Sequence, residues 1–480
     1  MQSFDVTVIG GGVVGCFVAR ELSRYRLRVL LLEKEADVSC GTSGANSGVV
    51  HSGFKEEPGS LKAEYSRLGN RLFPKICKDL SVPFRRVGTV IIATEESEVR
   101  SLEKMGEAAD RIGIERVILL SKRELSRREP NVHGVAGLLA SSGGIVTPYL
   151  LTIALAENAV ANGVKVMLDS EVKDIRQTSH GFKLKTAAGS FISEYVVNSA
   201  GLYADRIAGM IGKSSHTVYP CRGEYLILDK KRRNLVSSMV YPVMPKGLGE
   251  VGVHITPTLE GNLLLGPTAE YVRDKDDVRL TSSKVDELIV GAQYLVPSIS
   301  KKDVIRGYSG MRSRIVPSDS KVKGDFVIQE KPDCFINLFG MESPALTAAP
   351  VIAGKVLEII REGRKLKPNR KFNPVRRVPK RFDELSSREK AALIRRNPAY
   401  GEVVCRCENV SKAEVIRALN NPLGVRTLKG LKYRARVLMG RCQGGVCIPR
   451  IAKIYDELGV PLDEVTLKGE GSELFTGWSR

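Results

Sequence analysis

The chain carries two sets of residues that could hold redox groups, one near each end. Near the amino end, glycines stand at Gly10, Gly12 and Gly15, directly after the strand-like run Val-Thr-Val-Ile at 6–9. In such a run the first glycine permits a tight turn, the second lets the backbone approach a pyrophosphate, and the third lets the next helix pack closely. The helix N-terminus favours a phosphate, and Glu33, about 20 residues further on, could accept hydrogen bonds from a ribose. The pattern predicts a dinucleotide site without choosing between FAD and NAD.

The second set consists of four cysteines near the carboxyl end. They form the pairs Cys405-Arg-Cys407 and Cys442-Gln-Gly-Gly-Val-Cys447. Four thiolates in two close pairs suit either a zinc ion or an iron–sulfur cluster. Zinc sites favour cysteines separated by two to four residues. The single-residue spacing of the first pair therefore favours a [2Fe–2S] cluster, with zinc as the alternative.

Composition and charge narrow the class of protein. The length of 480 residues predicts more than one domain. The net charge of +20 could favour binding to a nucleic acid, a membrane surface or an acidic partner. Aromatic residues make up only 6% and no nucleic-acid motif is present, so we expect no nucleic-acid partner. No apolar run predicts a transmembrane segment. Nine cysteines without a secretory signal indicate a reducing, cytoplasmic compartment, with any membrane association peripheral and through partners.

The elements that must position these residues follow an α/β pattern. A strand over 4–10, a helix over 13–25 and a strand over 28–32 form a βαβ unit around the glycines. Residues 195–200 repeat the buried-strand pattern and end at Gly201. Further expected elements are helices over 60–80 and 97–112, strands over 89–93 and 164–168, and a β-rich stretch from about 217 to 272.

The loop over 40–53 helps to choose the cofactor. It reads Cys-Gly-Thr-Ser-Gly-Ala-Asn-Ser-Gly-Val-Val-His-Ser-Gly, and its small residues could lie along an extended diphosphate. With this loop the chain resembles the FAD-dependent oxidoreductases of the D-amino-acid-oxidase superfamily. The segments 197–205 and 308–312 are also similar to that superfamily. Within it, the segments 46–53, 58–63, 222–225 and 252–256 are similar to L-2-hydroxyglutarate dehydrogenases.

The carboxyl-terminal domain resembles a different relative. Its four cysteines are arranged as in the anaerobic glycerol-3-phosphate dehydrogenase large subunit. The flanks over 405–409 and 439–447 are similar to the bacterioferritin-associated-ferredoxin type of [2Fe–2S] domain.

These patterns predict a chain of mixed α/β and α+β class. We expect a Rossmann-like FAD domain with an inserted β-rich substrate domain, and a small C-terminal helical iron–sulfur domain. Prolines and like charges over 361–381 indicate an interdomain linker, and the alternative is a docking strip for an acidic partner. The oxidoreductase is expected over 1–360. Its FAD segments are expected at about 1–80, 145–215 and 305–360, and its substrate segments at about 81–144 and 216–304. The linker is expected over 361–400 and the iron–sulfur domain over 401–480.

The resemblance implies which residues contact FAD. They lie in the glycine run, the loop after the second strand, the strand near 200 and the last loop before a helix. The implied residues are Gly10, Gly12, Gly15, Glu33, Lys34, Thr42, Ser43, Asn46, Ser47, Gly48, Val172, Ala200, Gly201, Gly310, Gly340, Met341, Glu342 and Ser343. Some relatives attach the flavin through a histidine near His51, so a covalent and a non-covalent flavin both remain open.

His51 is the leading catalytic candidate because it lies in the loop expected to pass the flavin. An imidazole there can take a hydroxyl proton while the adjacent C–H leaves as a hydride; the alternative is a histidine that only hydrogen-bonds the flavin or the backbone. His254 is the second candidate, as a substrate contact or proton acceptor, and its alternative is a structural role. Arg312 is expected on the substrate side, where a guanidinium binds carboxylate or phosphate; its alternative is a surface salt bridge.

Three more residues are candidates for the substrate pocket: Arg222, Tyr225 and Lys55. Lys55 stands where several glycerol-3-phosphate dehydrogenases have a phosphate-binding arginine. The segment 339–347, Phe-Gly-Met-Glu-Ser-Pro-Ala-Leu-Thr, departs from the Gly-Gly-Lys that is usual in that family. This departure counts against a phosphate substrate.

Together these observations predict an FAD-dependent dehydrogenase that oxidises the secondary alcohol of a small anion. Glycerol 3-phosphate is the first prediction, because the cluster domain joined to this flavoprotein is the longer shared feature. A 2-hydroxy acid such as 2-hydroxyglutarate is the alternative. An amine or amino-acid dehydrogenase and a non-enzymatic electron carrier are the other hypotheses. Electrons would pass through the cluster to a partner subunit or a quinone-linked acceptor, which would make the chain part of a hetero-oligomer.

Overall fold

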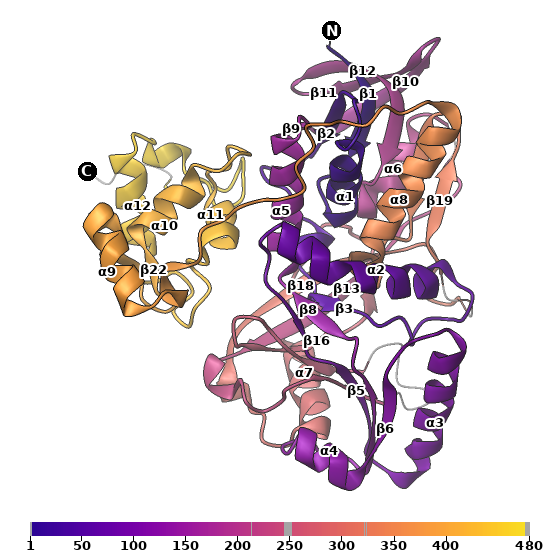
Figure 1. Cartoon of the computed structure of the whole chain (residues 1–480), viewed down its shortest axis with the longest axis vertical. Helices are drawn as coiled ribbons and strands as arrows, with labels where there is room; N and C mark the ends of the chain where they lie inside the picture. Colours follow the sequence, from indigo (N-terminus) through magenta and orange to yellow (C-terminus); the bar gives the residue numbers. More distant parts are fainter. Residues whose placement is uncertain (1, 213, 244–251, 321, 323, 476–480) are drawn as a thin grey trace.

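The computed structural model describes the whole chain except residues 1, 213, 244–251, 321, 323 and 476–480. Figure 1 shows one sheet with its helices in the upper part, a second sheet in the lower part, and the carboxyl-terminal domain to one side. An extended segment connects that domain to the upper part. The predicted α/β and α+β class is confirmed by this arrangement.

The amino-terminal segment folds as the predicted βαβ unit. Strand β1 (Gln2–Ile9) pairs in parallel with β2 (Val29–Leu32), and helix α1 (Val13–Leu22) connects them. All of β2 is buried, because apolar clusters cover both faces of its sheet. The helix ends three residues before the predicted position, at Leu22.

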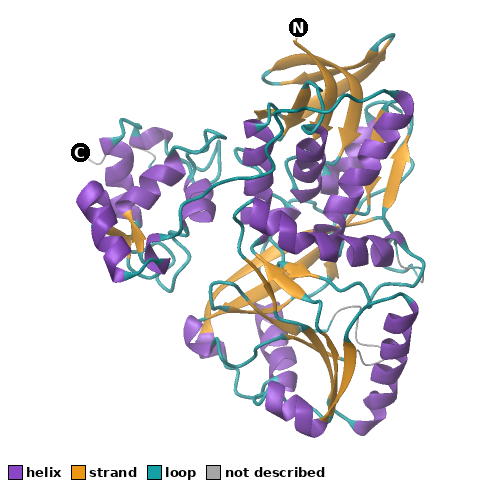
Figure 2. Ribbon diagram, viewed as in Figure 1, coloured by secondary structure: helices purple, strands orange, loops and turns teal. Residues whose placement is uncertain are grey.

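The first sheet has the strand order β10-β11-β12-β1-β2-β9, and β20 pairs with both β12 and β19. Its other strands are β9 (Lys165–Met167), β10 (Val172–Thr178), β11 (Gly181–Thr186), β12 (Gly189–Asn198), β19 (Val327–Glu330) and β20 (Phe335–Phe339). Helices α5 (Pro148–Ala161) and α8 (Ala345–Gly363) pack with α1 on one face; α6 (Ala204–Gly209) covers part of the other. Figure 2 shows these helices beside the sheet. The parallel strands β20, β12, β1, β2 and β9 therefore present their carboxyl ends together, where ligands bind in such sheets.

The second sheet follows the order β17-β13-β16-β15-β14-β5-β7-β6, with β18 paired to β13. Its strands are β5 (Thr89–Ala93), β6 (Val117–Ser121), β7 (Ala136–Ala140), β13 (Tyr219–Leu228), β14 (Met239–Pro242), β15 (His254–Pro257), β16 (Leu263–Gly266), β17 (Glu270–Tyr271) and β18 (Val304–Arg314). Alternate residues of β5 enter different cores. Val90 and Ile92 pack in the cluster of α7 (Ser282–Leu295), whereas Ile91 and Ala93 pack in that of α3 (Glu96–Arg111). The segment that begins at 305, which the sequence assigns to the first domain, thus opens with a strand of this second sheet.

A small sheet joins the two parts. It consists of β3 (Val49–Val50), β8 (Gly144–Val146) and β4 (Phe84–Arg86). Helix α2 (Leu61–Asp79) lies across the middle of the molecule between the large sheets (Figure 1).

The basic segment after α8 follows the surface of the first domain. Arg364 pairs with Asp5 and Glu194, and Arg376 pairs with Glu157. The linker is therefore attached along its course. Its later part is not wholly irregular, because helix α9 (Ser387–Arg396) lies within the predicted range 361–400.

The carboxyl-terminal domain has its own apolar core, to which α10 (Lys412–Leu419), α11 (Leu428–Ala435) and α12 (Ile448–Glu457) contribute. Its two short strands are β21 (Val403–Cys405) and β22 (Val410–Ser411). Across the residues that the structure describes, no helix combines the length and the apolar character needed to cross a bilayer.

Candidate active site

A cavity of about 1540 Å³ extends from the glycine turn, between the two large sheets, to the carboxyl-terminal domain. Most of the predicted cofactor and substrate residues line it. They are Gly10, Gly12, Glu33, Lys34, Thr42, Ser43, Asn46, Ser47, His51, Lys55, Val172, Ala200, Gly201, Tyr225, His254, Gly310, Arg312, Met341, Glu342 and Ser343. Gly15, Gly48, Arg222 and Gly340 lie outside this lining.

The glycine turn has the form that a dinucleotide requires. Gly10 adopts a φ of 107°, and a Cβ on Gly15 would lie 2.0 Å from the carbonyl oxygen of Gly10. A Cβ on Gly10 would itself lie 2.6 Å from the Ser199 carbonyl oxygen. The turn thus brings the first residues of α1, and the positive end of its dipole, to the cavity, where the Ser43 hydroxyl accepts a hydrogen bond from the Val13 N–H (2.8 Å). These residues fit the pyrophosphate of FAD.

Glu33 lies at the end of β2, as predicted, and its carboxylate borders the same turn. It accepts hydrogen bonds from the backbone N–H groups of Gly11 (2.6 Å) and Glu35 (3.0 Å). Burial raises the pKa of Glu33 to about 7, although these two donors act in the opposite direction. The geometry fits a carboxyl group that binds a ribose hydroxyl.

The loop after β2 is fixed to the second sheet. The Thr42 hydroxyl donates to the carbonyl oxygen of Met311 (2.8 Å), and the Asn46 amide donates back to the Thr42 carbonyl (3.1 Å). A Cβ on Gly310 would lie 1.9 Å from the carbonyl oxygen of Ala45. Gly310 therefore permits β18 to approach the loop, so that both domains together shape the cavity.

Two histidines from different domains face the cavity. His254, on β15, is 4% exposed, and its Nδ1 lies 2.9 Å from the Thr256 hydroxyl. Its ring packs against Tyr241 with 4.3 Å between centroids. His51 follows β3, and its Nε2 lies 3.3 Å from the Ser343 hydroxyl. Each imidazole thus has one polar partner that orients it.

The electrostatics of this region favour neutral imidazoles. Burial, and to a smaller extent the charge of Lys55, lower the pKa of His51 to about 3. Burial likewise holds the pKa of His254 well below its usual value, with further lowering by Lys55, His51 and Arg312. A neutral imidazole can accept a proton. Both histidines are therefore in the form that a general base needs.

Two cations share the region with the histidines. The Lys55 ammonium lies 3.1 Å from the ring centroid of Tyr241. The residue is exposed to the cavity by surface area, but desolvation by the surrounding wall lowers the pKa of Lys55 to about 7. Arg312 donates to the carbonyl oxygen of Thr268 through both terminal nitrogens (3.1 and 3.2 Å). In the described part of the chain, no carboxylate pairs with Arg312. Cations beside neutral imidazoles make this end of the cavity suited to a small anion.

Arg222 is placed differently from the other candidates. Its buried guanidinium pairs with Glu224 (3.5 Å), Glu270 (2.8 Å) and Asp277 (2.8 Å). These carboxylates hold the side chain in the second domain, outside the cavity lining. Conversely, Tyr241 could not be predicted as a site residue, because an aromatic residue in a strand pattern is typical of a core position.

The four cysteine sulfurs lie in two pairs. Cys407 Sγ is 3.7 Å from Cys442 Sγ, and the thiols of Cys405 and Cys447 hydrogen-bond to each other. Within the described ranges, no group of three or more His, Cys, Asp or Glu side chains converges on one metal position. Two pairs fit a cluster in which each of two irons takes two thiolates. The spacing within a pair is also compatible with two ligands of one zinc ion.

Helix α11 of the cysteine domain borders the cavity. The ring of Tyr433 stacks on Tyr149 with 4.3 Å between centroids and 15° between planes. Met439 and Gln443, on either side of Cys442, also line the cavity. The loop that carries a cluster ligand is therefore part of the wall around the flavin site. No local sequence signal predicts this contact.

Ion pairs hold the two parts together. Arg436 pairs with Glu260 of the second domain (3.1 Å) and with Glu408 of its own domain (3.0 Å). Arg441 pairs with Asp229 (2.6 Å). The sequence predicts that the cluster receives electrons from the flavin. The structure brings the two domains into direct contact, as such a transfer requires.

Comparisons with known proteins agree with these two sites. The family model described as FAD dependent oxidoreductase matches residues 5–358, and the model described as BFD-like [2Fe-2S] binding domain matches residues 403–457. A glycerol 3-phosphate dehydrogenase of Caloramator mitchellensis is 40% identical over 480 residues, which cover 99% of this chain and 98% of the relative. An L-2-hydroxyglutarate dehydrogenase of Indibacter alkaliphilus is 30% identical and covers 74% of this chain and 98% of the relative.

A solved structure is similar as well. The dithionite-reduced L-alpha-glycerophosphate oxidase of Mycoplasma pneumoniae, with FAD bound, has a TM-score of 0.74 and 32% identity, and covers 79% of this chain and 100% of that chain. The predicted FAD cofactor and the predicted [2Fe–2S] domain are confirmed by these matches.

Proposed function

We propose that this chain, which belongs to the FAD dependent oxidoreductase family, is a dehydrogenase that converts sn-glycerol 3-phosphate to dihydroxyacetone phosphate. Its electrons would pass through the [2Fe–2S] domain to a partner. The observation that carries the proposal is the convergence of two cations, Lys55 and Arg312, with two neutral imidazoles at one end of the flavin cavity. The full-length similarity to a relative named glycerol 3-phosphate dehydrogenase supports this choice of substrate.

The protein's own residues account for binding of the anion. When bound, FAD supplies the acceptor for the hydride of the donor carbon. The Thr268 carbonyl oxygen accepts from both terminal nitrogens of Arg312 and so orients the guanidinium, whose positive charge at the cavity can attract the phosphate of the substrate. Lys55 adds a second positive charge, and an anion beside it would keep the ammonium protonated.

Proton removal falls to one of the two imidazoles. His51 is neutral and lies in the loop that borders the flavin site, so it can accept the hydroxyl proton. His254 keeps its Nδ1 on Thr256, which leaves its other ring nitrogen available toward the cavity. We assign the base to His51 and give His254 the role of substrate contact and second candidate base.

A 2-hydroxy acid is the second candidate substrate. Arg312 and Lys55 could equally bind a carboxylate, and the relative named L-2-hydroxyglutarate dehydrogenase is similar over 74% of this chain. Anaerobic assays with an artificial electron acceptor separate the two. We expect glycerol 3-phosphate to bleach the flavin and to yield dihydroxyacetone phosphate, and L-2-hydroxyglutarate to be turned over at least tenfold less efficiently. Ammonia release from an amine would instead support an amine dehydrogenase, and failure of all these donors would contradict the proposal.

The onward electron acceptor and the cellular setting are also proposals. A one-electron cluster beside the flavin cavity supports delivery to a partner subunit or a quinone-linked acceptor, and hence a hetero-oligomer. None of the nine cysteines forms a disulfide, which supports a cytoplasmic location.

A further inference from the structure

Cys407 is the exposed member of the four-cysteine site. Cys405 and Cys447 are buried, and Cys442 is partly exposed. Electrons that reach the cluster can therefore leave most directly where Cys407 meets the surface. The surroundings of Cys407 decide which acceptor can approach it.

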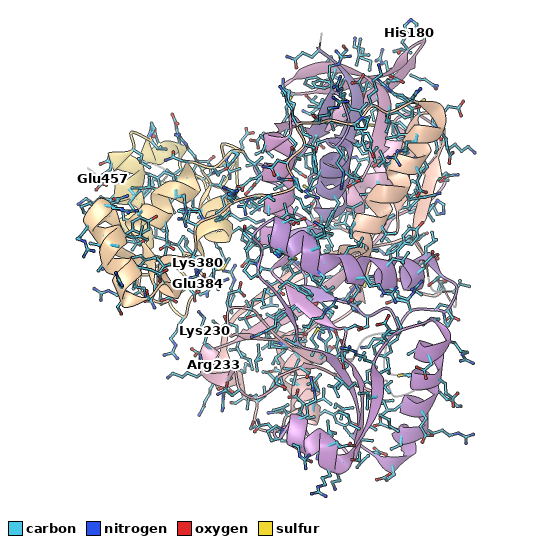
Figure 3. The ribbon with its side chains drawn as sticks, in the orientation of Figure 1. His180, Lys230, Arg233, Lys380, Glu384 and Glu457 are labelled. Atoms are coloured by element: carbon cyan, nitrogen blue, oxygen red, sulfur yellow. The ribbon has the colours of Figure 1, made fainter. Side chains whose placement is uncertain are left out.

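Two basic segments meet beside Cys407. The next residue, Glu408, pairs with Lys230 of the second domain (2.8 Å), and its backbone carbonyl accepts a hydrogen bond from Arg381 of the linker (3.0 Å). Figure 3 shows Lys230 and Arg233 on the side of the lower body next to the small domain, with Lys380 on the facing edge of that domain. The exposed cysteine thus lies between segments that are far apart in the sequence.

The charge of this surface is largely unbalanced. We define the basic rim as Lys231, Arg233, Lys380 and Arg406, all exposed residues of these segments. Among the residues described, none of the four forms an ion pair. The nearby acids Asp229, Asp303 and Glu408 are already paired. Asp383, which accepts a hydrogen bond from Asn409, and Glu384 are exposed on the same edge, and the charge of Lys380 acts on Glu389.

Such a rim favours an acidic partner. Unpaired lysines and arginines around an exit point attract an acidic surface, raise its association rate and fix its orientation. Attachment to a bilayer usually adds inserted Trp, Phe or Leu side chains to the basic residues. The runs 229–233 and 404–409 contain none of these. Beside Lys380 the chain has Phe382 and Leu385, of which Phe382 stacks on Tyr400 with 5.6 Å between ring centroids. A protein partner therefore fits this surface better than a lipid surface does.

We propose that the basic rim is the docking site for an acidic one-electron carrier protein, which takes electrons at Cys407. The proposal rests on the proposed function, because it names the class of acceptor for the same electrons. Oxidation of one secondary alcohol to a ketone releases two electrons and two protons. Two carrier molecules are therefore reduced per turnover, and the protons go to solvent.

The test uses the complete holoenzyme and two acceptor proteins of opposite charge. Plastocyanin, an acidic blue-copper protein, serves as the matching probe, and the basic cytochrome c serves as its counterpart. The variant Lys231→Glu/Arg233→Glu/Lys380→Glu reverses the rim. Arg123→Glu/Lys183→Glu/Lys185→Glu changes the same charge on exposed residues away from it.

We expect reduction of plastocyanin by the wild-type enzyme to be fast at low salt and to fall roughly tenfold as salt screens the rim. The rim variant should reduce plastocyanin about tenfold more slowly than the wild type at low salt, and it should bind oxidised plastocyanin more weakly in calorimetry. The rim variant should reduce cytochrome c faster than the wild-type enzyme does. Turnover with a small neutral dye should be unchanged in both variants.

Equal losses in the two variants, or an unchanged plastocyanin rate in the rim variant, would overturn the proposal. Loss of binding to anionic phospholipid vesicles, with plastocyanin binding unchanged, would replace it with a membrane site. If dye turnover fails in the wild type while plastocyanin binding still depends on the rim, the proposed function is wrong and the docking site stands.

Discussion

Arg434 binds Asp37 through two hydrogen bonds of 2.5 and 2.9 Å, and so joins α11 of the cysteine domain to the loop that follows β2. The two side chains are 6% and 3% exposed. Tyr433, the preceding residue, stacks on Tyr149 in the same contact. Met439 and Gln443, which flank Cys442, line the cavity that fits the flavin. The ion pair between Arg434 and Asp37 therefore helps to hold the cluster loop against this cavity.

The substitution Asp37→Asn should weaken the attachment of the cysteine domain. Breaking a buried pair costs about 3–5 kcal/mol when the remaining charge has no other partner, but Arg434 keeps the Glu157 carboxylate at 3.7 Å, so we expect a smaller loss. We expect faster proteolysis in the linker over 364–381, and slower reduction of the cluster after the flavin has been reduced in stopped-flow absorbance. Glu115→Gln breaks the exposed pair with Arg71 and should change neither measurement. Unaltered proteolysis and cluster reduction in Asp37→Asn would show that this pair does not hold the domain.

The low pKa of His51 predicts an unusual pH profile. A general base works when deprotonated, so a lowered pKa extends activity toward acid pH. With the pKa near 3, kcat/KM should show no acid limb near pH 6.5. His51→Gln should lower kcat by about 10²–10⁴-fold, whereas His254→Gln should mainly raise KM. The reverse pattern would assign the base to His254.

The position of Lys55 predicts a pH-dependent anion site. Desolvation by the cavity wall holds its pKa near 7 in the folded protein, although the residue is exposed by surface area, whereas an unfolded lysine titrates near 10.4. Between these values the unfolded chain binds more protons, so the free energy of unfolding of the ligand-free protein rises with pH across this window. Anion binding follows the opposite trend, because the ammonium is charged below pH 7 and neutral above it.

Sulfate, whose charge is constant in this range, tests the site by thermal unfolding. It should raise Tm more at pH 6 than at pH 8.5, and Lys55→Met should remove most of this difference. Lys104→Met, on the exposed face of α3, should leave it intact. A sulfate effect that is the same in both variants would place the anion elsewhere.

Local patterns were sufficient for the parts of the site that are formed by neighbouring residues. The glycine turn, Glu33 and the paired cysteines each follow from spacing, because one turn, one strand end or one loop positions them. The attached linker could not be predicted in this way. Its like charges indicate a solvated segment, and the acids that bind Arg364, Asp5 and Glu194, are distant in the sequence.

The contacts between domains could not be predicted from the sequence either. Helix α11 has basic and apolar residues at helical spacing, but nothing local shows that Tyr433 meets Tyr149 at the cavity. Arg222 is a similar case. It is next to residues of the predicted pocket, and its partners Glu270 and Asp277 come from a later part of the chain.

Arg222 and Arg312 should therefore behave oppositely when substituted. Arg222→Met leaves the fully buried Glu224 without its charged neighbour, and we expect a loss of about 3–5 kcal/mol in the free energy of unfolding. KM for glycerol 3-phosphate should change less than twofold in the protein that remains folded. Arg312→Met should leave the denaturation midpoint nearly unchanged and raise KM by at least tenfold, because this guanidinium faces the cavity without a carboxylate partner among the described residues. Urea unfolding and steady-state kinetics on the same preparations measure both effects. If Arg222→Met raises KM with stability unchanged, its guanidinium reaches the substrate and the ion pairs do not hold it in the second domain.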